Sequence, residues 1–244
     1  MTLTENTVGV SLEGSWTRYA TFDEAMRAVV TEGLSARSVE VKLYGNATST
    51  GAYTIRNGMT LDLNGNRLEG LSVRADFSVG VGTLTLRDSS QSGGGSSNVK
   101  FQTAGGRIQV DSGEWEDITA RNGSVTVDGG GVIKITAYDT VTLKGGKIDF
   151  LAVDKASVIS LSYGTFEGIR GINRKVLAAD LLAPGYAFRW DHDQKLQRYK
   201  DLPTLDDNTA IGNTTVVQCQ SHVFETGNPN CIYCNTPCTH PTVN

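Results

Sequence analysis

The sequence predicts an all-β fold in the form of a solenoid, in which the chain winds into stacked coils of short strands. Three observations predict this fold: a repeat with a period near 17 residues, apolar residues that alternate within each repeat, and a glycine at a fixed place in it. The 244 residues include 28 glycines and are only 39% hydrophobic, which suits many turns between short strands.

The repeat is clearest between residues 107 and 171, where four copies follow one another. The first apolar pairs are Ile108/Val110, Val125/Val127, Val141/Leu143 and Ile159/Leu161. The glycines are Gly113, Gly130, Gly146 and Gly164, spaced by 17, 16 and 18 residues, each followed two positions later by Trp115, Val132, Ile148 or Phe166. The closing pairs are Ile118/Ala120, Ile135/Ala137, Leu151/Val153 and Ile169/Gly171. Looser copies begin at Leu61/Leu63 and Leu84/Leu86, so one unit is stacked on copies of itself.

The period is too long for six-residue β-helix repeats and lacks the leucine-rich repeat signature, which leaves parallel coils about 4.8 Å apart. With this pattern, roughly residues 20–172 resemble the right-handed parallel β-helix proteins of the pectate-lyase-like kind. The segment 181–188 resembles the end of β-helical modules in large Gram-positive cell-surface proteins. These resemblances imply a right-handed coil and a secreted bacterial origin.

Both open ends of such a coil need a cover, because unpaired strand edges promote aggregation. Thr21 and Glu24 form a capping-box pattern, and the apolar spacing after it predicts an N-terminal capping helix over 22–32. Alternating aromatic residues predict a C-terminal capping hairpin of 186–190 and 195–199. We therefore expect a capped β-helix over 1–199, a linker over 200–217 and a small Cys/His module over 218–244, cut short within a longer protein.

The Cys/His module carries the strongest chemical pattern of the chain. Cys219 and His222 form one pair with two residues between them, and Cys231 and Cys234 form another. Two such knuckles supply the four soft donors that tetrahedral Zn²⁺ prefers, and 227–230 is a turn sequence that can fold one knuckle onto the other. The sequence predicts a structural zinc site whose metal folds the module.

Disulfide bonds are the alternative interpretation, since cysteines of a secreted protein often pair. The histidines in register with the cysteines favour zinc, as does the close spacing of Cys231 and Cys234. Cys238 and His240 look like the start of a second copy and could also replace a ligand of the first.

The coil itself shows few candidates for catalysis. Asp111 and Asp128 share a column of adjacent repeats, but Lys144 comes next in that column, which favours a solvated charged edge. An outward column of Gln109, Thr126, Thr142 and Ser160 forms a polar ladder that either binds an extended ligand or stabilises the sheet. The Gly-His-Gly and Arg-x-Lys motifs of polygalacturonase-like enzymes are absent, so no catalytic residue is predicted.

The predicted function is a non-catalytic binding or spacer module of a secreted or wall-attached bacterial surface protein. Its partner would be a host or dietary glycan or protein, and the alternative is a carbohydrate-active enzyme of the polysaccharide lyase or glycoside hydrolase kind. The net charge of −4, without a basic stripe, argues against nucleic acid. No run of about 20 apolar residues exists, so we expect no membrane insertion, and we expect a monomer.

Overall fold

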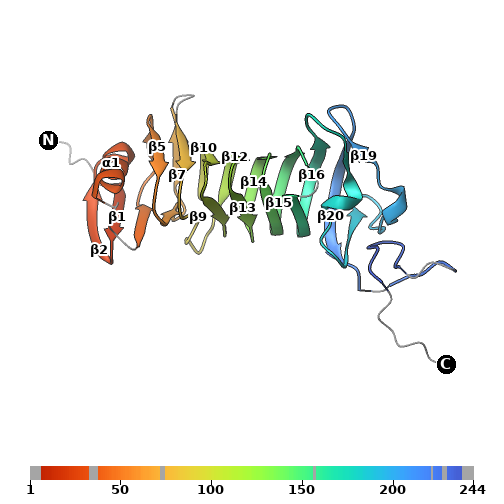
Figure 1. Ribbon diagram of the computed structural model, residues 1–244. Coiled ribbons are helices and arrows are strands. Elements are labelled where there is room, and N and C mark those ends of the chain that lie inside the picture. Colours follow the sequence, from red (N-terminus) through yellow and green to blue (C-terminus); the bar gives the residue numbers. More distant parts are fainter. Residues whose placement is uncertain are drawn as a thin grey trace.

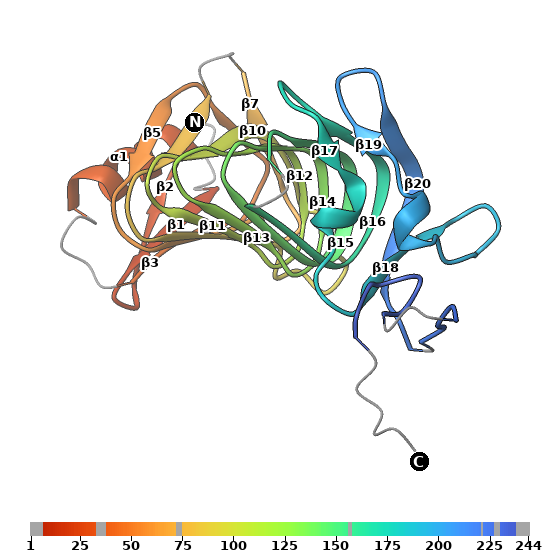
Figure 2. The same ribbon diagram turned by 45° about the vertical axis from the view of Figure 1, so that its right-hand side comes forward.

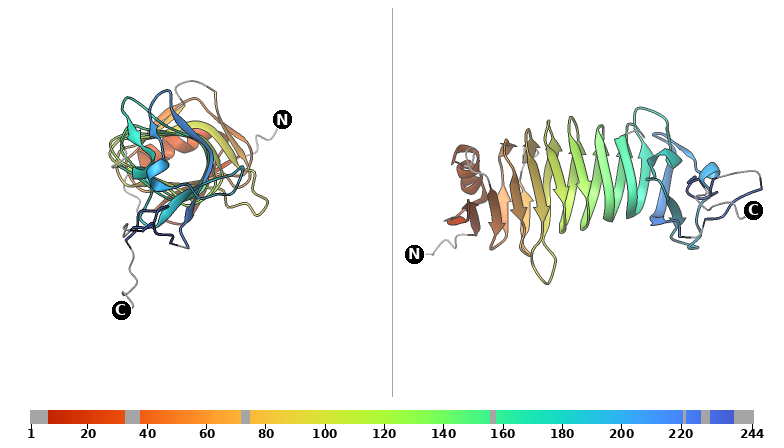
Figure 3. Two further views of the ribbon diagram at one scale, coloured as in Figure 1. Left: turned by 90° about the vertical axis from the view of Figure 1, so that its right-hand side faces the viewer. Right: turned by 60° about the horizontal axis from the view of Figure 1, so that its bottom comes forward.

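The structure, a computed structural model, describes residues 7–32, 38–71, 75–155, 158–220, 222–226 and 230–237. It is an all-β solenoid of about seven turns (Figure 1). Seen along its axis, the coils superimpose into a closed ring (Figure 3). The parallel β-solenoid expected from the repeat is confirmed, while its right-handed sense stays a prediction.

Three parallel ladders of strands form the walls of the solenoid. The first contains β3 (Val39–Leu43), β6 (Met59–Asp62), β9 (Thr83–Arg87), β11 (Arg107–Val110), β13 (Ser124–Val127) and the starts of β15 (Thr140–Val153) and β16 (Ile159–Gly171). The second contains β4 (Ala47–Ser49), β7 (Arg67–Gly70) and the first parts of β10 (Ser96–Thr103), β12 (Glu114–Ala120) and β14 (Gly131–Ala137), followed by β15 and β16. The third begins with β5 (Ala52–Ile55) and β8 (Asp76–Val79) and continues through the later parts of β10, β12, β14, β15 and β16.

The register of these ladders matches the columns of the sequence repeat. Val125, for example, pairs with Ile108 on one side and with Val141 on the other, and all three are at most 1% exposed. The earliest copy is shifted from the prediction, because Leu61 pairs with Leu86 rather than with Leu84. The looser pair is therefore Met59/Leu61, two residues before the predicted one.

The recurring glycines are explained by the turns between the first and second ladders. Gly130 has a φ of +76°, and a Cβ there would lie 2.6 Å from the carbonyl oxygen of Gly113 in the coil below. A side chain is therefore excluded both by backbone conformation and by the close stacking of the coils.

The helix α1 (Phe22–Glu32) lies at the N-terminal end of the solenoid, beside the hairpin of β1 (Val8–Leu12) and β2 (Ser15–Tyr19) (Figure 1). The capping box is present, because the N–H of Glu24 donates to Oγ1 of Thr21 and the N–H of Thr21 donates to Oε2 of Glu24, both at 3.2 Å. The antiparallel pairing of β1 with β3 covers the edge of the first ladder.

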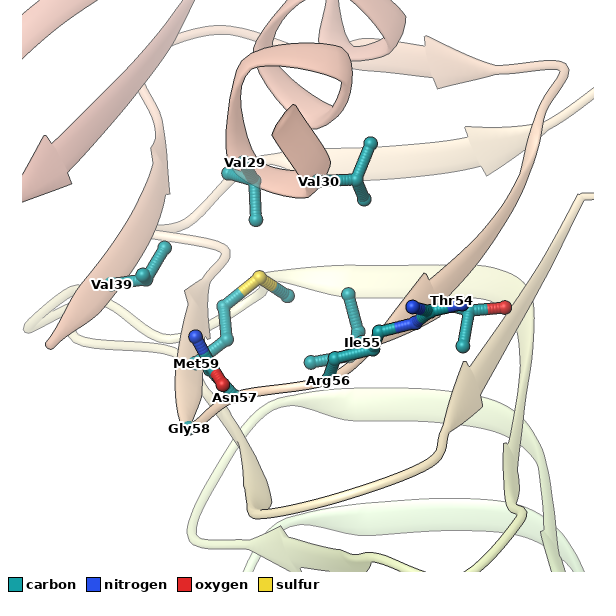
Figure 4. A pocket seen from close by; sticks show the side chains of 9 residues that line it. All are labelled: Val29, Val30, Val39, Thr54, Ile55, Arg56, Asn57, Gly58 and Met59. Carbon is teal, nitrogen blue, oxygen red and sulfur yellow. The ribbon is translucent and has the colours of Figure 1, made fainter. Parts of the chain in front are cut away.

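A small apolar cavity of about 20 Å³ lies between α1 and the first coil (Figure 4). Val29 and Val30 of α1 stand on one side, and Ile55 and Met59 stand on the other. This part of the interface between α1 and the coil is thus mainly apolar, with little space left in it, while Asp23 of α1 accepts hydrogen bonds from Thr50 and Tyr53 beside it.

The C-terminal end differs from the prediction in its strand pairing. The strand β20 (Ala210–Gln218) lies mostly within the predicted linker and pairs antiparallel with β16 and with β18 (Tyr186–Trp190) (Figure 2). The linker prediction for 200–217 is corrected, because β16 would otherwise leave an open edge and β20 carries the buried residues Ile211 and Val216.

The predicted hairpin is also altered. β18 takes β20 as its partner, and residues 195–199 form no strand but only one bridge, between Arg189 and Leu196. Short elements complete this end: β17 (Val176–Leu177), the 3₁₀ helices Ala178–Leu181 and Tyr199–Asp201, and β19 (Thr204–Leu205).

Candidate metal centre

The first knuckle of the Cys/His module follows directly from the solenoid. Cys219 comes after the last residue of β20, and its N–H donates to the carbonyl oxygen of Gly185 at 2.9 Å. His222 lies three residues later, with its ring stacked on Phe224 at 6.3 Å between ring centroids. The pairing of β20 thus fixes the position of the first sulfur donor.

The second knuckle is a tight turn. The N–H of Asn235 donates to the carbonyl oxygen of Cys231 at 2.9 Å, and the N–H of Cys231 donates to the carbonyl oxygen of Thr236 at the same distance. Asn235 has a φ of +52°, in the left-handed region that asparagine tolerates better than most residues. This turn brings Cys231 and Cys234 to the same side of the chain.

The structure brings all four predicted ligands together. Their donor atoms lie within 4.8 Å of one another. The sulfurs of Cys219 and Cys231 are 3.6 Å apart, and the sulfur of Cys234 is 3.5 Å from Nδ1 of His222. Donors at about 2.3 Å from a tetrahedral metal ion would be separated by about 3.8 Å, so the cluster is consistent with a metal site.

The pKa values of Cys219 in the first knuckle and Cys231 in the second are shifted in opposite directions. Burial raises the pKa of the Cys219 thiol above its ordinary range, and the neighbouring cysteines add to this effect. Burial also opposes ionisation of Cys231, but hydrogen bonds to its sulfur outweigh burial and lower its pKa to about 6. The donors, in decreasing order of effect, are the backbone N–H groups of Cys234, Tyr233 and Val223 and the side chain of His222. Such hydrogen bonds stabilise the thiolate form that a metal ion requires.

The cluster is attached to the solenoid by contacts that the sequence did not reveal. The N–H of Tyr199 donates to the carbonyl oxygen of Ile232 at 2.7 Å. Glu225 forms ion pairs with Arg198 and Lys200, each at 3.1 Å. These pairs are exposed, so each contributes at most about 1 kcal/mol. Because 198–200 carries no metal-ligand pattern, only its place in the fold identifies it as the contact surface.

The sulfurs of Cys219 and Cys231 are 3.6 Å apart, well beyond the roughly 2.05 Å of a disulfide bond, and Cys231 and Cys234 are free thiols. A disulfide between cysteines of the cluster therefore receives no support. Cys238, His240 and most of the predicted turn 227–230 lie outside the described residues.

The carboxylates of the coil are held by neighbouring side chains. Nε2 of Gln109 donates to Asp111 at 3.0 Å and to Asp128 at 2.8 Å, and Lys144 lies 3.5 Å from Asp128. This arrangement is the charged edge that the sequence predicted from Lys144, with one amide group bridging the two carboxylates and one ammonium group beside Asp128.

The predicted polar ladder is in register, with Gln109, Thr126, Thr142 and Ser160 paired in turn.

The structure also contains a hollow on another face, which the sequence analysis did not predict. It lies beside Phe150, which is 55% exposed although its neighbours across the strands are polar or small. The only sequence feature that could have indicated the hollow is the apolar Phe150 itself, in a column with Lys134 and Gly168 on the neighbouring strands.

Comparisons of the chain with protein-family models, with curated proteins and with solved structures found no match. None of the helices in the described part of the chain is long and apolar enough to cross a lipid bilayer. The candidate site is thus defined by its own donor atoms, their separations and their burial.

Proposed function

We propose that Cys219, His222, Cys231 and Cys234 bind one zinc ion. Three sulfur donors and one imidazole nitrogen form a set that suits Zn²⁺, and their separations of 3.5 and 3.6 Å fit a tetrahedron around it. Four protein donors fill that tetrahedron and leave no position for water or substrate. The role of the ion would be structural: it would join the knuckles and fix the tail against the end of the solenoid.

Metal analysis tests this site. The purified protein is expected to carry about one equivalent of zinc by plasma emission spectroscopy, as four donors bind one ion. The Cys234→Ser variant should lose the metal, whereas the matched control Cys238→Ser should retain it. A metal-free protein with no free thiols would refute the zinc site in favour of disulfides, and loss of zinc from the control would refute the assigned ligand set.

The chain as a whole is proposed to be a non-catalytic binding and spacer module of a secreted or wall-attached bacterial surface protein. The observation that supports this most is the shape: the solenoid is one elongated body, with β1 near one end and β20 near the other (Figure 1, Figure 3). About seven coils, each about 4.8 Å thick, would hold attached segments about 30 Å apart.

The proposal includes a cover at each end of the rod. The helix α1 would act as the N-terminal cap, and β18 with β20 would act as the C-terminal cap, so that no long strand edge is free to join another coil. A right-handed monomeric rod of this kind would present its sides to a host or dietary glycan or protein.

A glycan array combined with a polysaccharide-degradation screen tests the binding function. Retention of one or more glycans without product release is the expected result. Release of shortened or unsaturated oligosaccharides would overturn the non-catalytic proposal and favour a polysaccharide lyase or glycoside hydrolase.

A further inference from the structure

The hollow beside Phe150 lies on the third ladder, near the C-terminal end of the solenoid. Its volume is about 460 Å³, within the range of small-molecule sites. Strands β14, β15, β16 and β20 contribute its walls, and Lys134, Phe150, Glu167, Gly168, Arg170 and Gly212 are the lining residues that matter for binding. None of these residues belongs to the metal cluster.

The floor of the hollow is bare backbone. Lys134, Phe150, Gly168 and Gly212 pair in turn across the four strands, so the two glycines face each other beside the phenyl ring. A Cβ on Gly168 would lie 3.1 Å from a ring carbon of Phe150, and a Cβ on Gly212 would meet only the carbonyl oxygen of Glu167, also at 3.1 Å. A Cβ at Gly212 would therefore enter the floor of the hollow without contacting the ring.

The phenyl ring of Phe150 is the apolar wall. Lys134 and Asp117 precede it in this row of side chains, and both are polar. An aromatic ring that is 55% exposed gains little from folding, whereas a ligand that covers it gains the burial of that apolar surface. The negative face of an aromatic ring favours polarised C–H groups, such as those on the face of a sugar ring.

The charges around the hollow favour an anion. Arg170 has no ion pair with any carboxylate in the described chain, and Lys134 has only an exposed pair with Asp117 at 3.7 Å. The carboxylate of Glu167 is already paired with Lys147 at 2.9 Å. A ligand carboxylate could therefore meet the guanidinium of Arg170 in the two-pronged geometry that arginine provides.

We propose that this hollow binds an acidic sugar ring, a uronate of a polysaccharide, with its C–H face against Phe150 and its carboxylate at Arg170 and Lys134. The inference rests on the proposed glycan-binding function and gives it a site and a ligand class. An extended peptide fits less well, because β16, in the middle of the floor, is paired on one side with β15 and on the other with β20 and so offers no free edge of its own.

The test is titration calorimetry of the full chain with short oligosaccharides of polygalacturonate, alginate and hyaluronan. Each is compared with its carboxyl-reduced, neutral counterpart. At least one acidic series should bind, and its affinity should fall by about tenfold or more in Phe150→Ala, in Arg170→Gln and in Gly212→Val, as for central residues of a binding site. Trp16→Ala, which removes another exposed aromatic ring at the far end of the solenoid, should leave the affinity unchanged.

Folding of each variant is checked by far-ultraviolet circular dichroism, which is expected to match the unaltered protein. Binding that all three hollow variants retain would overturn this site while leaving the glycan-binding function intact. Equal binding of the neutral counterparts would overturn the acidic class. Absence of binding to every acidic series would also overturn the inference, and the glycan array then decides separately whether the broader function fails.

Discussion

The aromatic residues inside the solenoid offer a direct test of its inward and outward faces. Phe101 and Phe150 lie on the same ladder, but Phe101 points inwards and is 1% exposed, whereas Phe150 points outwards and is 55% exposed. The ring of Phe101 packs between those of Phe77 and Trp115, with centroid distances of 5.3 and 5.5 Å. Replacing each phenylalanine by alanine removes the same atoms from opposite faces of one sheet.

The expected cost differs between the two sites. Removal of a fully buried phenyl ring costs about 3–5 kcal/mol, and the two ring contacts of Phe101 place it at the upper end of that range. Phe150→Ala loses only part of a half-exposed ring and should cost about 1 kcal/mol. The difference of about 4 kcal/mol corresponds to roughly 12 °C in the melting temperature of a chain of this size.

Urea unfolding followed by far-ultraviolet circular dichroism measures both variants against the unaltered protein. A loss for Phe101→Ala that is within about 1 kcal/mol of the loss for Phe150→Ala would refute the reasoning, because a difference that small is typical of ordinary surface changes. It would mean that the side chains of this ladder do not alternate between the core and solvent.

Three further predictions concern backbone, charge and metal. Gly130→Ala should lower the free energy of unfolding by more than Gly14→Ala in the same urea assay. Both glycines have a positive φ, but a Cβ at Gly14 would meet nothing within 4 Å, whereas a Cβ at Gly130 would meet the coil below. Equal losses of unfolding free energy would argue against close stacking of the coils. Burial alone would raise the pKa of Asp62, but hydrogen bonds from Ser89 and the charges of Lys42 and Arg87 lower it below 3.8. The charged Asp62 therefore contributes its full stabilisation of the fold above pH 3.8, and this contribution is lost as the pH falls through the lowered pKa. Asp62→Asn should flatten the acidic part of the plot of unfolding free energy against pH. An unchanged plot would contradict this role of Asp62. Chelation of zinc should increase proteolysis of 219–237 while the solenoid keeps its melting temperature, and a large fall in that temperature would show that the metal supports the whole fold.

Much of the fold could be predicted because the solenoid repeats one local arrangement. Gly113 and Gly130 recur at a fixed place since each coil stacks its turn directly on the coil below, and apolar residues such as Val125 and Val127 recur since every coil contributes to one continuous core. The capping box of Thr21 and Glu24 is equally local, because the two residues are only three positions apart in the chain, and their spacing was enough to predict it.

The ends of the solenoid could not be predicted in the same way. Residues 200–217 are rich in Asp, Asn and Thr, which is typical of a linker, yet 210–218 form β20. They do so because β16 offers an unpaired edge, which is a property of the stacked coils and not of the segment itself. Residues 195–199 have the alternation of a strand but make only one bridge to β18, between Arg189 and Leu196, with backbone hydrogen bonds on either side of it. The long partner of β18 is β20, which comes from much later in the chain, and such a pairing is decided only when all segments are placed.

The sequence by itself determined the repeat, the inward columns, the helix start and the four donors Cys219, His222, Cys231 and Cys234, because each depends on residues close together in the chain or on a strict period. The tertiary structure alone decided which strands pair at each end, how Glu225 attaches the Cys/His module to the solenoid, and that Phe150 borders a hollow over two glycines. These features bring together residues from segments that are far apart in the sequence. The distances between such residues are set by how the coils stack, which no single segment of the sequence specifies.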